Sequence, residues 1–215
     1  MNQIKHHLTD ALLMGYSAGI LPEAFNLVVA THISLCDDCR ARMMEFDTVG
    51  GEVMDSETPV DMQTDSLAAT LALIASGDAS EPATPSYAKG LFPDPLQAYV
   101  GGDLDAVKWR KVGGGVRQAI LPTDQSASVR LLHIPAGAAV PDHGHEGMEL
   151  TLVLQGAFTD ESDRFGAGDI EIADEDVDHK PVAEQGLDCI CLAATDAPLR
   201  FNGLIPRMAQ PFLQI

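Results

Sequence analysis

Two groups of residues in this 215-residue chain have the types and spacing of metal ligands, and the first lies in "THISLCDDCRAR", residues 31–42. On a helix, His32, Cys36 and Cys39 occupy positions i, i+4 and i+7, so their side chains project from one face. Zinc accepts histidine nitrogen and cysteine sulfur tetrahedrally, and a closed structural site needs a fourth ligand. The spacing therefore predicts three ligands of a zinc site. The alternatives are a dithiol redox pair and two cysteines that only pack in a core.

The fourth ligand would come from His6 or His7, at the start of "HHLTDALLMGYSAG". The spacing of apolar residues in this segment predicts a first helix. With its apolar face centred on Leu8, His7 lies about 100° away and His6 about 160° away. His7 can turn toward the core more easily, which favours it and leaves His6 as the alternative.

The second group lies in "GAAVPDHGHEGMELTLVLQG", residues 137–156. His143 and His145 are two residues apart, which places both on one side of a strand. Glu149 stays on that side if the next strand begins after a turn at Gly147. Two imidazoles and a carboxylate that converge inside a barrel favour a divalent metal such as iron, manganese, nickel or zinc. Because such groups are costly to bury without a partner, the pattern favours a bound metal.

The secondary structure that must position these residues is predicted to change from helices to strands after the first third of the chain. The apolar spacing over residues 1–76 predicts three or four helices. The longest is expected to run from Pro22 to the glycines at 50–51, and the last to be capped by Ser66.

Beyond these helices, prolines among small polar residues at 77–95 indicate a linker. From residue 96, short apolar runs of period two, separated by turn residues, predict a sandwich or barrel. The expected organisation is a helical domain at 1–80, a linker at 81–95 and a β domain at 96–215.

Composition narrows the classes of function. The net charge of −19 argues against direct binding of nucleic acid and suits a basic protein partner. No apolar run approaches the roughly 18 residues of a membrane span, and no secretory signal is predicted at the start of the chain. Four cysteines in two close pairs then favour metal or redox chemistry over a disulfide framework.

The first group carries a family resemblance. His7, followed after 24 residues by "HISLCDDC", resembles the zinc-binding anti-sigma domain. The resemblance implies a small helical bundle that binds an extracytoplasmic-function sigma factor and hides the surfaces that contact RNA polymerase. It implies zinc held by His7, His32, Cys36 and Cys39. Residues 1–80 carry 12 acidic and 3 basic side chains, which suits a partner with basic, nucleic-acid-facing surfaces.

The second group matches the first motif of the cupin family, G-x5-H-x-H-x3-E-x6-G, from Gly137 to Gly156. This resemblance implies a jelly-roll β-barrel over about residues 100–205 and one more histidine from a later strand. The only candidate after Gly168 is His179, although the usual Pro-x-Gly turn is displaced and no asparagine follows. The implied metal set is His143, His145, Glu149 and His179.

Three residues of the β region fall outside that set. His133 precedes the motif and is expected to pack within a strand. Cys189 and Cys191 share one face of a strand in "LDCICLAA", where they either form a wall of small residues or act as an oxidant-responsive pair.

Taken together, the two resemblances indicate a ChrR-type zinc-binding anti-sigma factor of the α+β multidomain class. They imply a cytoplasmic, non-enzymatic regulator in a 1:1 complex with its sigma factor, which it releases under oxidants such as singlet oxygen. They also imply zinc in the helical domain, zinc or another divalent metal in the cupin domain, and a response that needs the cupin. The alternative is a metal-dependent cupin enzyme, a dioxygenase or isomerase, with a helical accessory domain. A stable sigma complex would favour the regulator, and turnover of a small molecule would favour the enzyme.

Overall fold

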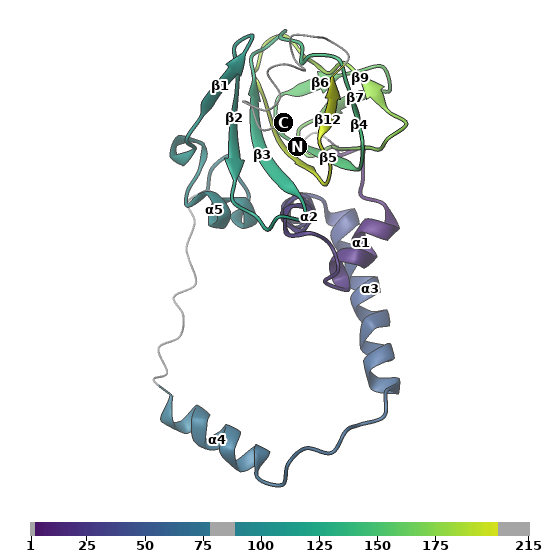
Figure 1. Cartoon of the computed structure of the whole chain (residues 1–215), viewed down its shortest axis with the longest axis vertical. Coiled ribbons are helices and arrows are strands. Elements are labelled where there is room, and N and C mark those ends of the chain that lie inside the picture. The colour runs from purple at the N-terminus through teal and green to yellow at the C-terminus, as the bar shows by residue number, and fades with distance from the viewer. Residues whose placement is uncertain (1–2, 78–88, 202–215) are drawn as a thin grey trace.

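The computed structural model describes residues 3–77 and 89–201, and it combines a helical N-terminal region with a β domain (Figure 1). The α+β prediction is therefore confirmed. The predicted linker at 81–95 lies outside the described residues as far as residue 88. The helices are α1 (Asp10–Ser17), α2 (Glu23–Leu35), α3 (Asp37–Ser56), α4 (Ser66–Ser76) and α5 (Asp94–Val100), followed by a short 3-10 helix (Leu104–Ala106).

The first helix begins later than its apolar pattern predicts. Thr9 caps α1 by accepting a hydrogen bond from the backbone N–H of Leu12 on its side-chain oxygen, 3.3 Å away. His6 and His7 therefore precede the helix, and the prediction that places them on it is wrong. Both lie in a segment without regular secondary structure that runs alongside the β domain.

The long helix predicted from Pro22 to the glycines at 50–51 is also wrong, because the chain breaks at Cys36. This residue has φ −109° and ψ 107°, which ends α2 and begins α3. Its sulfur accepts the backbone N–H of Cys39, 3.5 Å away, in the place of a helix cap. The helix α3 then continues through both glycines to Ser56, since a glycine inside a helix costs only about 1 kcal/mol.

Within residues 89–201, the β domain consists of three sheets. A six-stranded sheet has the order β1-β2-β3-β11-β5-β8, and two three-stranded sheets have the orders β10-β6-β7 and β12-β4-β9. The strands are β1 (Arg110–Gly113), β2 (Val116–Leu121), β3 (Ser128–Ile134), β4 (His143–His145), β5 (Glu149–Gln155), β6 (Ala157–Thr159), β7 (Arg164–Gly166), β8 (Ile170–Ala173), β9 (Asp178–His179), β10 (Val182–Ala183), β11 (Cys189–Thr195) and β12 (Leu199–Phe201).

The central strands of the six-stranded sheet, β3, β11 and β5, are buried on both faces. Along β5, Leu150, Leu152 and Leu154 point to the outer face and share a core with the buried side of α2. Val153 points the other way, into a second cluster inside the barrel with Phe158. The helical region is therefore packed on the outer wall of the barrel, since an apolar sheet face must be covered.

The helix α4 stands apart from the rest. The helices α1, α2 and α3 contact one another, whereas α4 has no buried residue and lies away from them (Figure 1). It starts at Ser66, so the prediction that Ser66 caps this helix is wrong. The N-cap position is Asp65, whose side chain makes no capping hydrogen bond. Within the described residues, none of the helices combines the length and apolar character needed to cross a membrane.

Candidate metal sites

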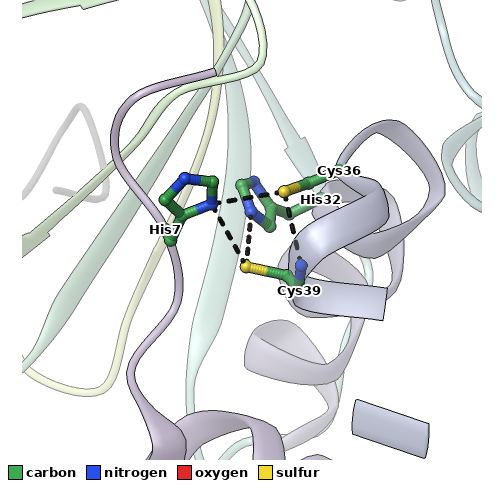
Figure 2. Close-up of side chains that lie close together, drawn as sticks. All are labelled: His7, His32, Cys36 and Cys39. Carbon is green, nitrogen blue, oxygen red and sulfur yellow. Dashed lines mark hydrogen bonds between the residues drawn. The ribbon is translucent and has the colours of Figure 1, made fainter. Parts of the chain in front are cut away.

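The N-terminal cluster consists of His7, His32, Cys36 and Cys39, the four residues expected from the sequence (Figure 2). Nδ1 of His7 lies 3.3 Å from Sγ of Cys36 and 3.6 Å from Sγ of Cys39. Nε2 of His32 lies 3.3 Å from Sγ of Cys39. Atoms bound to a tetrahedral zinc at about 2.0–2.3 Å lie roughly 3.5 Å apart, so the cluster has the dimensions of such a site.

Three separate pieces of chain meet at this cluster. His7 comes from the segment before α1, His32 from the last turn of α2, and Cys39 from the first turn of α3. Cys36 stands at the break between the two helices. The other candidate, His6, points elsewhere: its Nε2 lies 3.1 Å from the carboxylate of Asp163.

The charge states of the cluster suit a cation. Burial, together with the neighbouring His7, lowers the pKa of His32 to about 4, so its ring is neutral at pH 7. Burial raises the pKa of Cys39 to about 11. A metal must therefore displace a proton from this thiol, and the resulting thiolate would be compensated by the bound cation.

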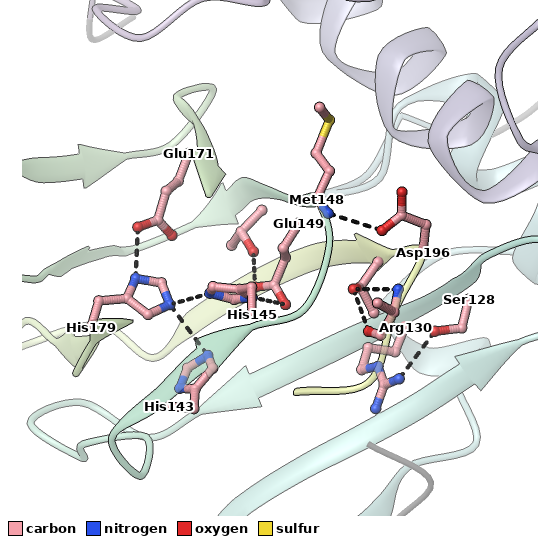
Figure 3. A network of polar contacts seen from close by, with 12 residues as sticks. Ser128, Arg130, His143, His145, Met148, Glu149, Glu171, His179 and Asp196 are labelled. Carbon is pink, nitrogen blue, oxygen red and sulfur yellow. Dashed lines mark hydrogen bonds and ion pairs between the residues drawn. The ribbon is translucent and has the colours of Figure 1, made fainter. Parts of the chain in front are cut away.

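The second cluster is positioned by strand register. His143 and His179 are direct partners across antiparallel β4 and β9, and His145 lies two residues along β4. All three imidazoles therefore share one face and point into the barrel (Figure 3). The Nε2 atom of His179 lies 3.2 Å from Nε2 of His143 and 3.2 Å from Nε2 of His145.

Glu149 completes this group from the six-stranded sheet. As the first residue of β5, it brings a carboxylate oxygen to 3.8 Å from Nδ1 of His145. The four ligand atoms lie within 4.8 Å of one another, the three histidines are buried, and Glu149 is partly buried. Three imidazole nitrogens and one carboxylate form a donor set for zinc or another divalent transition metal.

Further contacts orient the imidazoles. Nδ1 of His143 lies 2.8 Å from the carbonyl oxygen of Pro141, so an N–H there donates and Nε2 is the ring nitrogen that faces the cluster. Nδ1 of His179 lies 2.9 Å from Glu171 and 3.1 Å from Asp160. Such partners fix the ring of a metal-binding histidine and increase its basicity.

The same contacts set the pKa values in the barrel. Burial lowers the pKa of His143 and of His145, so both rings are neutral at pH 7. Burial opposes protonation of His179 too, but the hydrogen bonds and charges of Glu171 and Asp160 raise its pKa to about 9. Burial raises the pKa of Glu171 to about 7. The Glu171–His179 pair therefore holds a proton that a metal at Nε2 would have to displace.

Sequence reasoning missed Glu171 and Asp160. Glu171 had a signal, because it is a charged residue in the middle of the apolar strand "IEIA", and it pairs with Thr151 on the face that carries Glu149. Asp160 follows β6 in a connecting loop, and no pattern distinguishes it from other loop carboxylates.

The remaining candidates lie outside both clusters. The ring of His133 contacts Arg117 at 2.9 Å and Asp188 at 3.2 Å, as expected for a residue within a strand. Cys189 and Cys191 are buried in the barrel with their sulfur atoms 3.5 Å apart. The hydrogen bond with Cys189, together with burial, raises the pKa of Cys191 well above its ordinary value, which favours the wall interpretation over a reactive thiol.

Fold and sites together define a class of protein: a helical unit with a His/Cys cluster joined to a cupin-type barrel with a His/Glu cluster. Residues 97–197 match the family described as the ChrR cupin-like domain. Over 212 residues the chain is 61% identical to anti-sigma-E factor ChrR of Cereibacter sphaeroides, covering 99% of each chain.

The likeness extends to a solved structure, the crystal structure of Rhodobacter sphaeroides SigE in complex with the anti-sigma ChrR. The match has a TM-score of 0.79 and 60% identity, and it covers 90% of this chain and 100% of that one. The chain therefore belongs to the ChrR family of anti-sigma factors.

Proposed function

We propose that this protein is an anti-sigma factor that binds an extracytoplasmic-function sigma factor in a 1:1 complex and holds it away from RNA polymerase. The observation that carries the proposal is the likeness to ChrR over almost the whole chain, including the ChrR chain that is bound to SigE. We infer a cytoplasmic location, because such a partner acts on RNA polymerase. Family membership favours this regulator over a metal-dependent cupin enzyme.

An apolar surface on α3 and α4 supports the binding of a protein partner. In α3 only Cys39 is buried, and α4 is exposed along its whole length although most of its residues are apolar. Apolar side chains that stay exposed along a helix of a folded protein mark an interaction site. The largest exposed apolar side chains of the two helices are Met44, Val49, Val53, Met54, Leu67, Leu71, Leu73 and Ile74.

Zinc in the N-terminal cluster would stabilise the position of this apolar surface. It would hold His7, the end of α2 and the start of α3 together, and so fix the direction in which α3 leaves the barrel. We propose that this zinc is structural, because four protein ligands would leave no open position for chemistry.

The barrel would carry the response to oxidants such as singlet oxygen. Its cluster, His143, His145, Glu149 and His179, would hold zinc or another divalent metal in a separate place from the N-terminal one. A change there lowers the affinity for sigma only if the two states of the barrel bind sigma differently. The packing of α2 on the barrel supplies a physical contact through which such a difference could pass.

The partner surface is tested with Leu71→Asp in the full chain. Leu71 is 54% exposed on α4, and a charge there would be buried in the complex. Affinity for the purified sigma factor, measured by calorimetry, is expected to fall roughly 10- to 100-fold. The matched control is Leu187→Asp, a 57% exposed leucine on the barrel, which should bind like the wild type. If both variants bind the sigma factor with equal affinity, α4 is not part of the interface. If the wild-type chain forms no complex with the sigma factor, the proposed function is wrong.

A further inference from the structure

The segment Ile4–His7 connects the two metal clusters, and Asp169 holds it to the barrel. Asp169 is 4% exposed and lies in the turn between β7 and β8. One carboxylate oxygen accepts the backbone N–H groups of Lys5, at 2.6 Å, and His6, at 3.0 Å. The other oxygen accepts the backbone N–H of Gly166 at 2.8 Å, which ties the carboxylate to its own turn.

Further contacts fit the segment closely to this turn. Gly168 has a φ of +94°, which favours glycine, and a Cβ added there would lie 2.7 Å from the side chain of Ile4. The backbone N–H of Ile170 donates to the carbonyl of His6 at 3.4 Å. The ring of His6 packs on Phe165 with centroids 4.4 Å apart. The residue that follows these contacts in the chain is His7, whose ring faces both thiols of the N-terminal cluster.

The same turn leads into the barrel cluster. The backbones of Gly168 and Asp169 are hydrogen-bonded to Val153 of β5, the strand that begins with Glu149. Two residues after Asp169, Glu171 contacts Nδ1 of His179 at 2.9 Å. Asp169, which holds the segment that carries His7, and Glu171, which contacts His179, are therefore only two residues apart.

We propose that Asp169 is a positioning residue for the N-terminal metal cluster: it holds His7 in place from the barrel and makes the β7–β8 turn the link between the two clusters. A carboxylate suits this role, because it can accept two backbone N–H groups on one oxygen while the other oxygen stays bound to the turn. The inference goes beyond metal binding itself. Its meaning for sigma release rests on the proposed function, but its direct test does not.

The test compares Asp169→Ala with Asp163→Ala in the full, zinc-loaded chain. Asp163 is a 63% exposed carboxylate on the same surface that contacts only the side chain of His6 and its neighbour's backbone. We expect Asp169→Ala to transfer zinc from the N-terminal cluster to a chromogenic chelator at least tenfold faster than wild type, as for other residues that support a ligand. Asp163→Ala should match the wild type. Asp169→Asn keeps an oxygen for Lys5 and His6 but places an NH2 group against the N–H of Gly166, so it should recover only part of the loss.

Amide hydrogen exchange provides a readout that does not involve the metal. Exchange at Lys5 and His6 should accelerate about tenfold in Asp169→Ala, because their acceptor is gone. If exchange accelerates while zinc release keeps the wild-type rate, Asp169 does not position His7 and the proposal is overturned. If the wild-type chain forms no complex with the sigma factor while these rates are as expected, the proposed function alone is contradicted.

A second pair of variants covers the case in which Asp169→Ala does not fold. His6→Pro and His6→Ala both lack the imidazole, but only the proline lacks the backbone N–H that donates to Asp169. Faster zinc release is expected for His6→Pro relative to His6→Ala. Equal rates would count against the role of this hydrogen bond.

The link itself is tested by a double-mutant cycle. In the wild-type chain, Glu171→Gln is expected to change zinc release from the N-terminal cluster about fivefold, at the low end of usual coupling between sites. In the Asp169→Ala chain, the same change should have no effect. Equal effects in both backgrounds would show that the turn does not connect the clusters.

Discussion

The two metal clusters of this protein are assembled in opposite ways. The barrel cluster lies on hydrogen-bonded strands, where the register of β4 and β9 alone places His143 beside His179. The N-terminal cluster joins a segment without regular structure to the ends of two helices, and those pieces converge at the cluster itself. In the barrel, strand pairing fixes the positions of the metal ligands. In the N-terminal cluster, a metal bound by the ligands would fix the positions of the helices.

This difference suggests a division of labour. A cluster whose ligands come from separate pieces of chain loses its geometry when the metal leaves, because metal binding there is also folding. A cluster built on strands keeps its geometry, so its metal can change while the fold persists. The first arrangement suits a structural element of a partner-binding surface, and the second suits a sensor.

The largest effect is expected from Cys39→Ala. Removing this ligand should abolish zinc binding at the N-terminal cluster and weaken sigma binding at least 100-fold, since the direction of α3 is no longer fixed. Metal analysis and calorimetry measure both quantities. The matched control is Cys191→Ala, also a buried cysteine, which should keep both metals and lose only about 1 kcal/mol of stability. Tight sigma binding by metal-free Cys39→Ala would show that the N-terminal metal is not needed for the partner-binding surface.

The next effect is expected in the barrel, from His145→Ala. Metal affinity of the barrel cluster should fall at least 100-fold, because one of four ligands is lost, while the N-terminal zinc and the fold remain. The control is His133→Ala, a barrel histidine outside both clusters, which should keep both metals. Metal content and thermal unfolding followed by circular dichroism distinguish them. A collapse of the barrel in His145→Ala alone would show that its metal, too, is structural.

Much of this comparison could be predicted from the sequence, because ligand spacing is a local property. His32, Cys36 and Cys39 come together as expected, but not on one helix. The break at Cys36 is a tertiary effect, since the residue adopts an extended conformation in which its sulfur caps α3 and faces His7. Helical periodicity carries no information on such a break.

The same limit applies to packing between the two regions. The alternation in "ELTLVLQ" predicts an apolar face of Leu150, Leu152 and Leu154, and the structure confirms it. What covers that face depends on contacts far apart in the chain, so the docking of α2 could not be foreseen. The hydrogen bonds from the backbone N–H groups of Lys5 and His6 to Asp169 join residues more than 160 positions apart, and no sequence motif predicts them.

The smallest effect is expected from Glu171→Gln. Glutamine keeps an oxygen that can accept from Nδ1 of His179 but removes the negative charge, which lowers the pKa of that imidazole and its strength as a ligand. Metal affinity of the barrel should fall about tenfold, measured by competition with a chelator. Glu184→Gln, which breaks only an exposed ion pair with Arg164, should leave it unchanged. An unchanged affinity in Glu171→Gln would show that the second contact, from Asp160, suffices.

We expect the barrel cluster to carry the response to oxidants and the N-terminal cluster to carry the inhibition of sigma. The most direct measurement is transcription from a sigma-dependent promoter with purified polymerase, sigma factor and full-length protein, before and after exposure to singlet oxygen. Wild type should inhibit and then release, and His145→Ala should inhibit equally well but stay bound after exposure. Release of sigma from His145→Ala at the wild-type rate would show that the barrel cluster does not carry the response.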